Sequence, residues 1–233
     1  VGSSGMGSGM GMMGCPGGGT NGWASYRNLG LTDAELQGLA VFNDPKRANC
    51  SSCHSMEAGS AGYPLFTDYG YDNIGLPKNP DNPFYAMPET WNPDGADWID
   101  FGLGGYLMSS GEAPEVYEPE LGKFKVPTLR NVDLRPSDDT VKAYGHNGYF
   151  KSLEDIVFFY HWRAAMDIEC SGESATGMGG GMGMGMGNCE MMSSMFPAPE
   201  VDQNRTPLAM FPRPQVNNIV AFLKTLSDGY YER

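Results

Sequence analysis

The sequence contains no run of 18 consecutive apolar residues, and positively charged side chains are scarce. Its 15 lysines and arginines stand against 28 aspartates and glutamates, which gives a formal net charge of −13. Without an apolar run of that length, no transmembrane helix is predicted. The shortage of positive charge argues against nucleic acid, and against an anionic membrane surface, as a partner. It favours a basic partner protein or, more simply, solubility.

Histidine is also scarce, and this limits the metal chemistry that the chain can carry. There are three histidines and five cysteines, and one histidine directly follows a cysteine pair in Cys50-Ser51-Ser52-Cys53-His54. A zinc site would need two more ligands at similar spacing, and a thioredoxin-like pair would need a preceding βαβ pattern. The sequence has neither. Cys-x-x-Cys-His is instead the attachment sequence of c-type haem.

The spacing of this motif suits one covalently attached haem c. Each thiol can form a thioether with a haem vinyl group, and the histidine then reaches the iron from the proximal side. We therefore predict one haem on Cys50 and Cys53, with His54 as an iron ligand. Because bacterial c-type haem is attached outside the cytoplasmic membrane, the motif also predicts a periplasmic or extracellular location.

Two segments are rich in glycine and methionine. Residues 1–22 are expected to form a low-complexity arm, and residues 171–196 form a second such segment; together they hold 11 of the 16 methionines. Thioethers are suitable ligands for Cu(I). No histidine or cysteine cluster focuses these methionines into one geometry, so adaptable packing is preferred over copper binding.

The three cysteines outside the motif predict a disulfide in an oxidising compartment. A bond between Cys170 and Cys189 would close the second Gly/Met segment on itself. A bond between Cys15 and Cys189 would instead join the two segments. Both pairings remain open, and a leftover Cys15 favours self-association of copies through the Gly/Met segments.

Residues 23–233 are interpreted as a single domain with insertions at about 56–122 and 171–200. Its first helix is expected to begin at Thr32, where Thr-Asp-Ala-Glu forms a capping box, and to end at Asn43-Asp44-Pro45.

Two further helices are expected along the chain. One begins at Ser152 and runs through Trp162, and the last covers about residues 215–226 with apolar residues at i, i+3 and i+4. Residues 56–122 lack periodicity and are interpreted as irregular loops with a short strand or a helical turn, and residues 124–129 as extended. A helix before the haem motif and an amphipathic helix near the end predict a mainly α, class I cytochrome c-like domain around one haem.

Several strings, in order over about residues 30–230, resemble the C-terminal haem domain of the bacterial cytochrome c peroxidase/MauG family. The most specific are Lys125-Val126-Pro127-Thr128-Leu129-Arg130-Asn131 and Gly145-His146-Asn147-Gly148; the others are Phe66-Thr67-Asp68, Asn73-Ile74-Gly75-Leu76-Pro77, Gly102-Leu103-Gly104-Gly105, Ser152-Leu153-Glu154-Asp155, Phe159-Tyr160, Pro197-Ala198-Pro199-Glu200 and Ala221-Phe222-Leu223-Lys224-Thr225-Leu226.

Two departures from the family pattern bear on function. Family peroxidases carry two haems in two domains, whereas this chain has one Cys-x-x-Cys-His. The resemblance places peroxide chemistry at the other haem. The usual Pro-Tyr-x-His segment is also replaced by residues 137–146, so no calcium site is predicted.

The resemblance bears on the distal ligand as well. In the family, the axial methionine follows the histidine that corresponds to His146 by fourteen residues. The same count from His146 reaches Tyr160 in this sequence. MauG-like members use a tyrosine there, and a phenolate lowers the iron's potential. Tyr160 is therefore preferred as the second iron ligand. Met166 and His161, an open site, or simple packing of Tyr160 on the haem remain alternatives.

Three further residues are expected around the haem. The resemblance places Pro127 and His146 there, His146 beside the ligands or the propionates and as the acid/base candidate if the protein is an enzyme. Arg130 is the expected propionate partner, because a buried carboxylate needs a charged donor; a plain surface role is its alternative.

These predictions favour an exported monohaem cytochrome that passes electrons to a redox partner protein. The alternatives are a peroxidase or MauG-like enzyme, and a cytochrome subunit that forms filaments or other assemblies.

Overall fold

The computed structural model describes residues 30–60, 62–134, 140, 142–169 and 194–228. Its α-helices are α1 (Asp33–Phe42), α2 (Gly102–Ser109), α3 (Pro114–Tyr117), α4 (Leu153–Glu169) and α6 (Gln215–Lys224), and its strands are β1 (Tyr71–Asp72) and β2 (Phe124–Lys125). The predictions for Cys15, Cys170, Cys189 and most of the Gly/Met segments concern residues outside these ranges. None of the helices in these ranges is long and apolar enough to cross a membrane.

Helix α1 begins at the predicted capping box. The Thr32 hydroxyl accepts the main-chain N–H of Glu35 at 3.4 Å, and the Glu35 carboxylate accepts the N–H of Thr32 at 2.6 Å. These two bonds satisfy donors that the first turn of a helix leaves unpaired. The predicted start and end of the helix are both confirmed.

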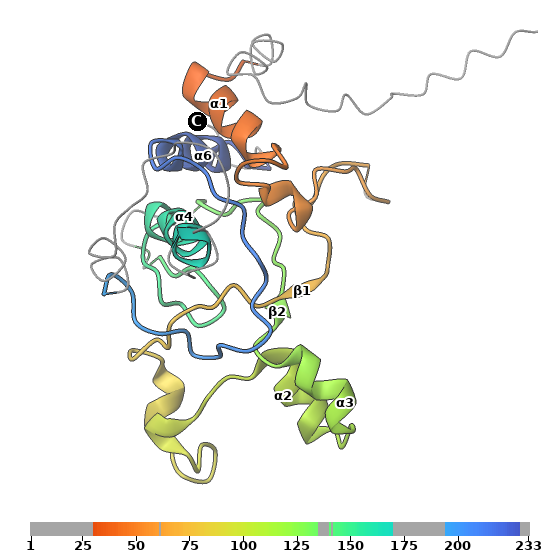
Figure 1. Ribbon diagram of the computed structural model, residues 1–233, viewed down its shortest axis with the longest axis vertical. Helices are drawn as coiled ribbons and strands as arrows, with labels where there is room; N and C mark the ends of the chain where they lie inside the picture. The colour runs from red at the N-terminus through yellow and green to blue at the C-terminus, as the bar shows by residue number, and fades with distance from the viewer. Residues whose placement is uncertain (1–29, 61, 135–139, 141, 170–193, 229–233) are drawn as a thin grey trace, which may run out of the picture.

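Helices α1 and α6 cross and pack against each other (Figure 1). The crossing point is Gly38, where a Cβ atom would overlap the main-chain carbonyl of Asn218. Beside it, the Asn218 amide donates to the Gln37 side chain at 3.1 Å, and the rings of Phe42 and Phe222 lie edge to face at 5.3 Å. The first and last predicted helices therefore meet as expected for a cytochrome c-like domain.

Helix α4 packs against α6 on the side away from α1 (Figure 1). Its start at Ser152 is confirmed, because the serine hydroxyl accepts the N–H of Asp155 at 3.0 Å. The helix runs further than predicted, to Glu169. Phe159, Arg163 and Ala164 are buried along it, so helix α4 lies against other elements on several sides.

The prediction of irregular structure over residues 56–122 was wrong for its second half, which contains α2 and α3. Helix α2 carries three glycines, and glycine is a poor helix former. Main-chain bonds from a distant segment hold it in place: Leu103 donates to the carbonyl of Lys123 at 2.9 Å, and Gly122 donates to that of Phe101 at 2.9 Å.

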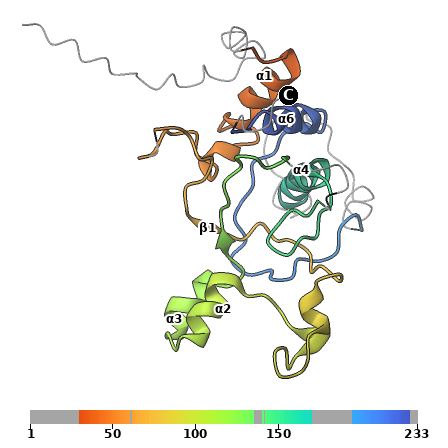
Figure 2. The same ribbon diagram turned by 180° about the vertical axis from the view of Figure 1, so that it is seen from behind.

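Two lobes project from the end of the molecule opposite α1 and α6 (Figures 1 and 2). The first lobe comprises residues 80–98 and the second comprises residues 102–121. A two-stranded antiparallel sheet, in which Tyr71 pairs with Lys125, leads into the second lobe from the body of the domain.

Candidate haem site

The Cys-x-x-Cys-His motif forms a tight turn directly after α1. Cys50–Ser52 is one turn of 3-10 helix, and the main-chain N–H of His54 donates to the carbonyl of Cys50 at 2.9 Å. Both cysteines are half-buried free thiols. The turn brings the two sulfurs and the imidazole to one place, as attachment of a single haem requires.

The environment of the two sulfurs favours an uncharged form. Burial raises the pKa of Cys50 to about 12 and that of Cys53 to about 11, where a hydrogen bond with Asp72 adds to the effect. The Cys53 sulfur and the carboxylates of Asp68 and Asp72 lie within 4.8 Å of one another. A thiolate beside two carboxylates is unfavourable, whereas a thioether carries no charge. The site therefore fits covalent haem better than a reactive or zinc-binding thiolate.

The ring of His54 is oriented by a main-chain carbonyl. Its Nδ1 lies 3.0 Å from the oxygen of Phe66, and since a carbonyl only accepts, Nδ1 carries the proton. This leaves Nε2 with a lone pair for a metal. Burial lowers the pKa of His54, and the carbonyls of Phe66 and Pro127 partly offset that effect. The residue thus has the tautomer that an iron ligand needs.

Phe66 itself has an unusual backbone conformation. Its φ is 53°, in the left-handed region. The next residue fixes it, because the Thr67 hydroxyl donates to the carbonyl of Val126 at 2.7 Å and accepts the N–H of Tyr69 at 3.0 Å. Strain of this kind persists only where the surroundings over-determine it. Phe66 is a positioning residue that the sequence analysis missed.

Tyr160 on α4 shares its surroundings with the haem motif. Burial raises the pKa of Tyr160 above its usual range, and the nearby Cys50, Cys53 and Asp72 raise it further. A phenol in this setting stays protonated unless a cation lies beside it. The predicted distal residue is therefore close to the two sulfurs that would hold the haem.

The two alternative ligands lie at other positions around α4, and both stay predictions, since His161 makes the same kind of Nδ1 bond as His54. The Nδ1 atom of His161 lies 2.6 Å from the carbonyl of Phe211, in the segment that leads into α6. Met166 is six positions beyond Tyr160, which places it about 120° away around a helix of 3.6 residues per turn. Tyr160 stays the preferred candidate, because Cys50 and Cys53 both raise its pKa.

The side chain of Arg130 contacts the C-terminal segment. It forms an ion pair with Asp228, donates to the carbonyl of Pro64 at 3.4 Å and lies 4.8 Å from the ring centre of Tyr63. Its guanidinium is about a quarter exposed. Its role as a propionate partner stays a prediction, because the structure gives this side chain a carboxylate of its own.

His146 packs flat on Phe124, with ring centres 3.4 Å apart and ring planes 7° from parallel. His146 is exposed at one side, but the atoms packed around its ring desolvate it and lower its pKa to about 4, an effect that Asp100 partly offsets. The imidazole is therefore neutral near pH 7. Its predicted place beside the haem also stays a prediction.

Arg163 is a second residue that the sequence analysis missed. It is 2% exposed and lies one turn beyond Tyr160 on α4. Its guanidinium donates to the carbonyls of Ile74 and Thr206, both at 2.9 Å, and pairs with Asp167 at 3.1 Å, while its Nε has no acceptor. An arginine inside the apolar run of α4 was the signal that could have revealed it, since arginine is seldom fully buried.

Comparisons with known proteins find relatives named MauG and cytochrome-c peroxidase. No protein-family model matches the chain. It is 31% identical to the methylamine utilization protein MauG of Paracoccus denitrificans, in a match that covers 79% of this chain and 40% of that protein. It is 26% identical to the cytochrome-c peroxidase IdrP1 of Denitromonas iodatirespirans, in a match that covers 60% of this chain and 34% of that protein. The crystal structure of the diheme peroxidase BthA from Burkholderia thailandensis E264 matches 88% of the chain with a TM-score of 0.54 and 28% identity.

A Cys-x-x-Cys-His turn beside crossed first and last helices defines the class of cytochrome c-like domains. Within that class, the chain belongs to the cytochrome c peroxidase/MauG family. It spans less than half the length of the relatives it matches: 40% of the Paracoccus MauG and 45% of the BthA chain.

Proposed function

We propose that this chain is a class I cytochrome c-type domain that binds one haem c and serves electron transfer. Cys50 and Cys53 would form the thioethers to the haem, and His54 and Tyr160 are the residues that would hold its iron. The observation that carries the proposal is the shared environment of Tyr160 and the two cysteines, together with a tautomer of His54 that leaves Nε2 available. Haem c, when bound, supplies one-electron redox chemistry.

The residues around the site hold and shield the haem. The carbonyl of Phe66 keeps His54 in one orientation, so its Nε2 is aimed without reorganisation. Arg163 ties the helix that carries Tyr160 to two segments far away in the sequence, through Ile74 and Thr206. Rigid ligands on both sides favour rapid electron transfer, because little of the protein has to move when the charge changes.

An electron carrier is favoured over an enzyme for this domain by the weak basicity of its acid/base candidate. His146 is the acid/base candidate, and with a pKa of about 4 it is a weak base near neutral pH. Two protein ligands would also leave no position open for a substrate on the iron. The relatives are named as peroxidases and MauG, and the chain spans less than half of each. An enzyme of that type is therefore the second candidate.

Location and partner follow from the same motif. We propose that the domain acts in the periplasm or outside the cell, where c-type haem is attached, and exchanges electrons with another redox protein. Export can be tested by fractionating cells and following haem-stained protein.

Spectroscopy with stopped-flow mixing tests the function. We expect the purified ferric protein to be six-coordinate and low-spin, to be reduced by a small electron donor, and to leave its spectrum unchanged on mixing with hydrogen peroxide. Steady peroxide turnover at enzymatic rates of ~1 to 10³ per second would overturn the electron-carrier proposal in favour of the enzyme.

A further inference from the structure

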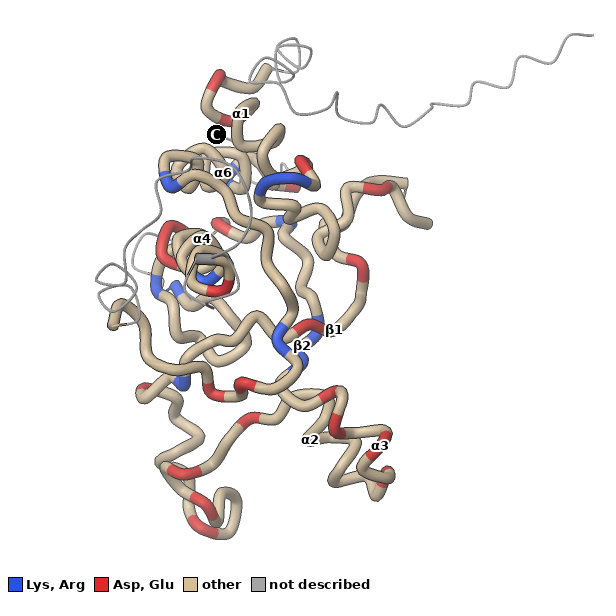
Figure 3. The backbone as a smooth tube through the Cα atoms, viewed as in Figure 1, with Lys and Arg blue, Asp and Glu red and all other residues tan. Residues whose placement is uncertain are grey.

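The two lobes and the segments that join them have one sign of charge. Residues 79–122, called here the acidic end, contain nine aspartates and glutamates and no lysine or arginine. In Figure 3 the charged residues of both lobes are all acidic. Of these carboxylates, Glu120 alone forms an ion pair within the described part of the chain, with Lys123 at 3.2 Å.

Apolar side chains are exposed among these carboxylates. In the first lobe Trp91 is 72% exposed, and in the second lobe Tyr106 is 68% and Val116 46% exposed. Exposed aromatic residues surrounded by charge are typical of the centre and rim of protein interfaces. Scattered apolar residues need no explanation, but here they occupy the same segments as the unpaired carboxylates.

The acidic end is pre-formed. In the first lobe the buried Asn92 amide donates to the carbonyls of Phe84 and Gly95, both at 2.9 Å. Lys78, at the base of this lobe, donates to the carbonyls of Ala96 and Trp98. A surface held in place by such bonds loses little conformational entropy when a partner binds.

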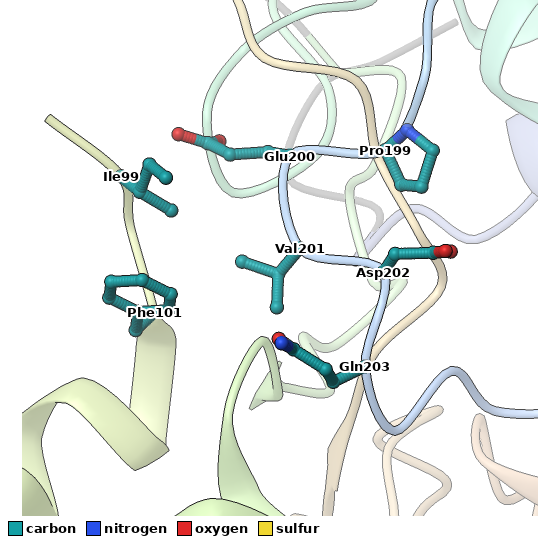
Figure 4. A pocket seen from close by; sticks show the side chains of 7 residues that line it. All are labelled: Ile99, Phe101, Pro199, Glu200, Val201, Asp202 and Gln203. Atoms are coloured by element: carbon teal, nitrogen blue, oxygen red, sulfur yellow. The ribbon is translucent and has the colours of Figure 1, made fainter. Parts of the chain in front are cut away.

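A hollow of about 490 Å³ lies where the lobes join the body. Ile99 and Phe101 form one wall, and the segment 199–203 forms the other. Figure 4 shows Glu200 and Val201 pointing from that segment toward the opposite wall. The lining combines apolar side chains, such as Ile99 and Phe101, with the carboxylates of Glu200 and Asp202. Such a mixed lining suits a lysine or arginine side chain, which has an apolar stem and a charged head.

We propose that the acidic end is the docking surface for a basic protein, which covers the exposed aromatics and inserts a lysine or arginine into the hollow. A second copy of this chain does not fit, because it would place like charges against each other. A metal ion does not fit either: among the described residues, no three of these carboxylates converge as Cys53, Asp68 and Asp72 do. Charge spread over two lobes matches an extended basic surface.

Calorimetric titration of the ferric holoprotein with ferric mitochondrial cytochrome c, a lysine-rich protein, tests the proposal. We expect binding at low ionic strength that Glu112→Gln/Glu115→Gln weakens about 5- to 10-fold, since rim charges dominate attraction at low salt. The matched control Glu57→Gln/Asp155→Asn removes two exposed carboxylates outside the acidic end and should change the Kd less than about 2-fold.

The Trp91→Ala variant distinguishes an apolar contact with the partner from electrostatic attraction. We expect it to weaken binding severalfold at both low and moderate salt, because an apolar contact is not screened. Equal effects of the two double variants, no binding at low salt, or a dimer that Trp91→Ala disrupts in sedimentation would each overturn the proposal. The acidic end does not include the residues of the haem site, so a negative binding result would leave the proposed electron-transfer function unchanged.

Discussion

The imidazole of His54 donates its Nδ1 hydrogen to the main-chain carbonyl of Phe66 across 3.0 Å, and Phe66 holds a left-handed φ of 53° in doing so. The conformation costs about 1–3 kcal/mol for a non-glycine residue. A side-chain substitution cannot delete a main-chain acceptor. The orientation of His54 is therefore set by the backbone, and side-chain changes at Tyr160 should alter a bound haem more.

The first prediction concerns that distal side. Tyr160→Phe should remove a phenolate ligand and convert the ferric haem from six-coordinate low-spin to high-spin, and the midpoint potential should rise because a phenolate stabilises ferric iron. Resonance Raman and redox titration measure both changes. Met166→Leu, on the same helix, is the control and should leave the spectrum unchanged. A spectrum that changes in Met166→Leu and not in Tyr160→Phe would assign the ligand to the methionine.

The second prediction concerns attachment. The intact protein should be heavier than its polypeptide by one haem, and the haem should stay with the chain on acid extraction. In Cys50→Ala/Cys53→Ala any bound haem should be extractable, since no thioether can form. Peptide mapping of the unaltered protein gives an independent check, because the peptide with Cys50 and Cys53 should carry the whole increment. A mass without the increment, or two haems, would contradict the prediction.

The third prediction concerns the pH dependence of stability. His146 has a pKa of about 4 in the folded protein, below the ordinary value of 6.5. Between these pH values the unfolded chain binds a proton that the folded protein does not. Stability from this group is therefore complete above about pH 6.5 and is lost as the pH falls toward 4. His146→Gln should flatten the fall of the urea midpoint across that window.

An NMR titration checks the same assignment directly. The ring protons of His146 should not shift between pH 5 and pH 8. A titration centred near 6.5 would show that stacking on Phe124 leaves the imidazole accessible to protonation.

The fourth prediction concerns the helix crossing. Gly38→Ala should lower the free energy of unfolding by about 1–3 kcal/mol, because the added Cβ overlaps the Asn218 carbonyl and forces α1 and α6 apart. Gly59→Ala is the matched control: nothing lies within 4 Å of a Cβ there, so its effect should stay within about 0.5 kcal/mol. Urea unfolding of both variants gives the difference. Equal stability of the two would contradict a close crossing.

Local signals predicted α1, α4 and α6 well. Capping residues at Thr32 and Ser152 act on main-chain groups three positions away, so the sequence carries them directly. The apolar spacing of the last helix likewise predicted its buried residues, which include Val216, Ile219 and Leu223.

The features that the sequence did not predict depend on hydrogen-bond partners far away along the chain. Helix α2 contains glycines that argue against a helix, and its place depends on bonds with Lys123 and Gly122. Arg163 takes its acceptors from residues 89 and 43 positions away. The left-handed Phe66 is fixed through Thr67 by Val126, 59 positions on from the threonine. Such pairings form only when the chain has folded, so no local sequence pattern predicts them.

The crossing of α1 and α6 also has a consequence for the order of folding. The bond between Gln37 and Asn218 joins positions 181 apart, so closing this contact requires nearly the whole chain and carries a large loop-closure entropy. The attachment turn follows α1 directly and is complete long before α6 has been made. A haem bound by Cys50 and Cys53 would therefore be accessible to attachment while the domain is still open, and the last helix would close over it afterwards.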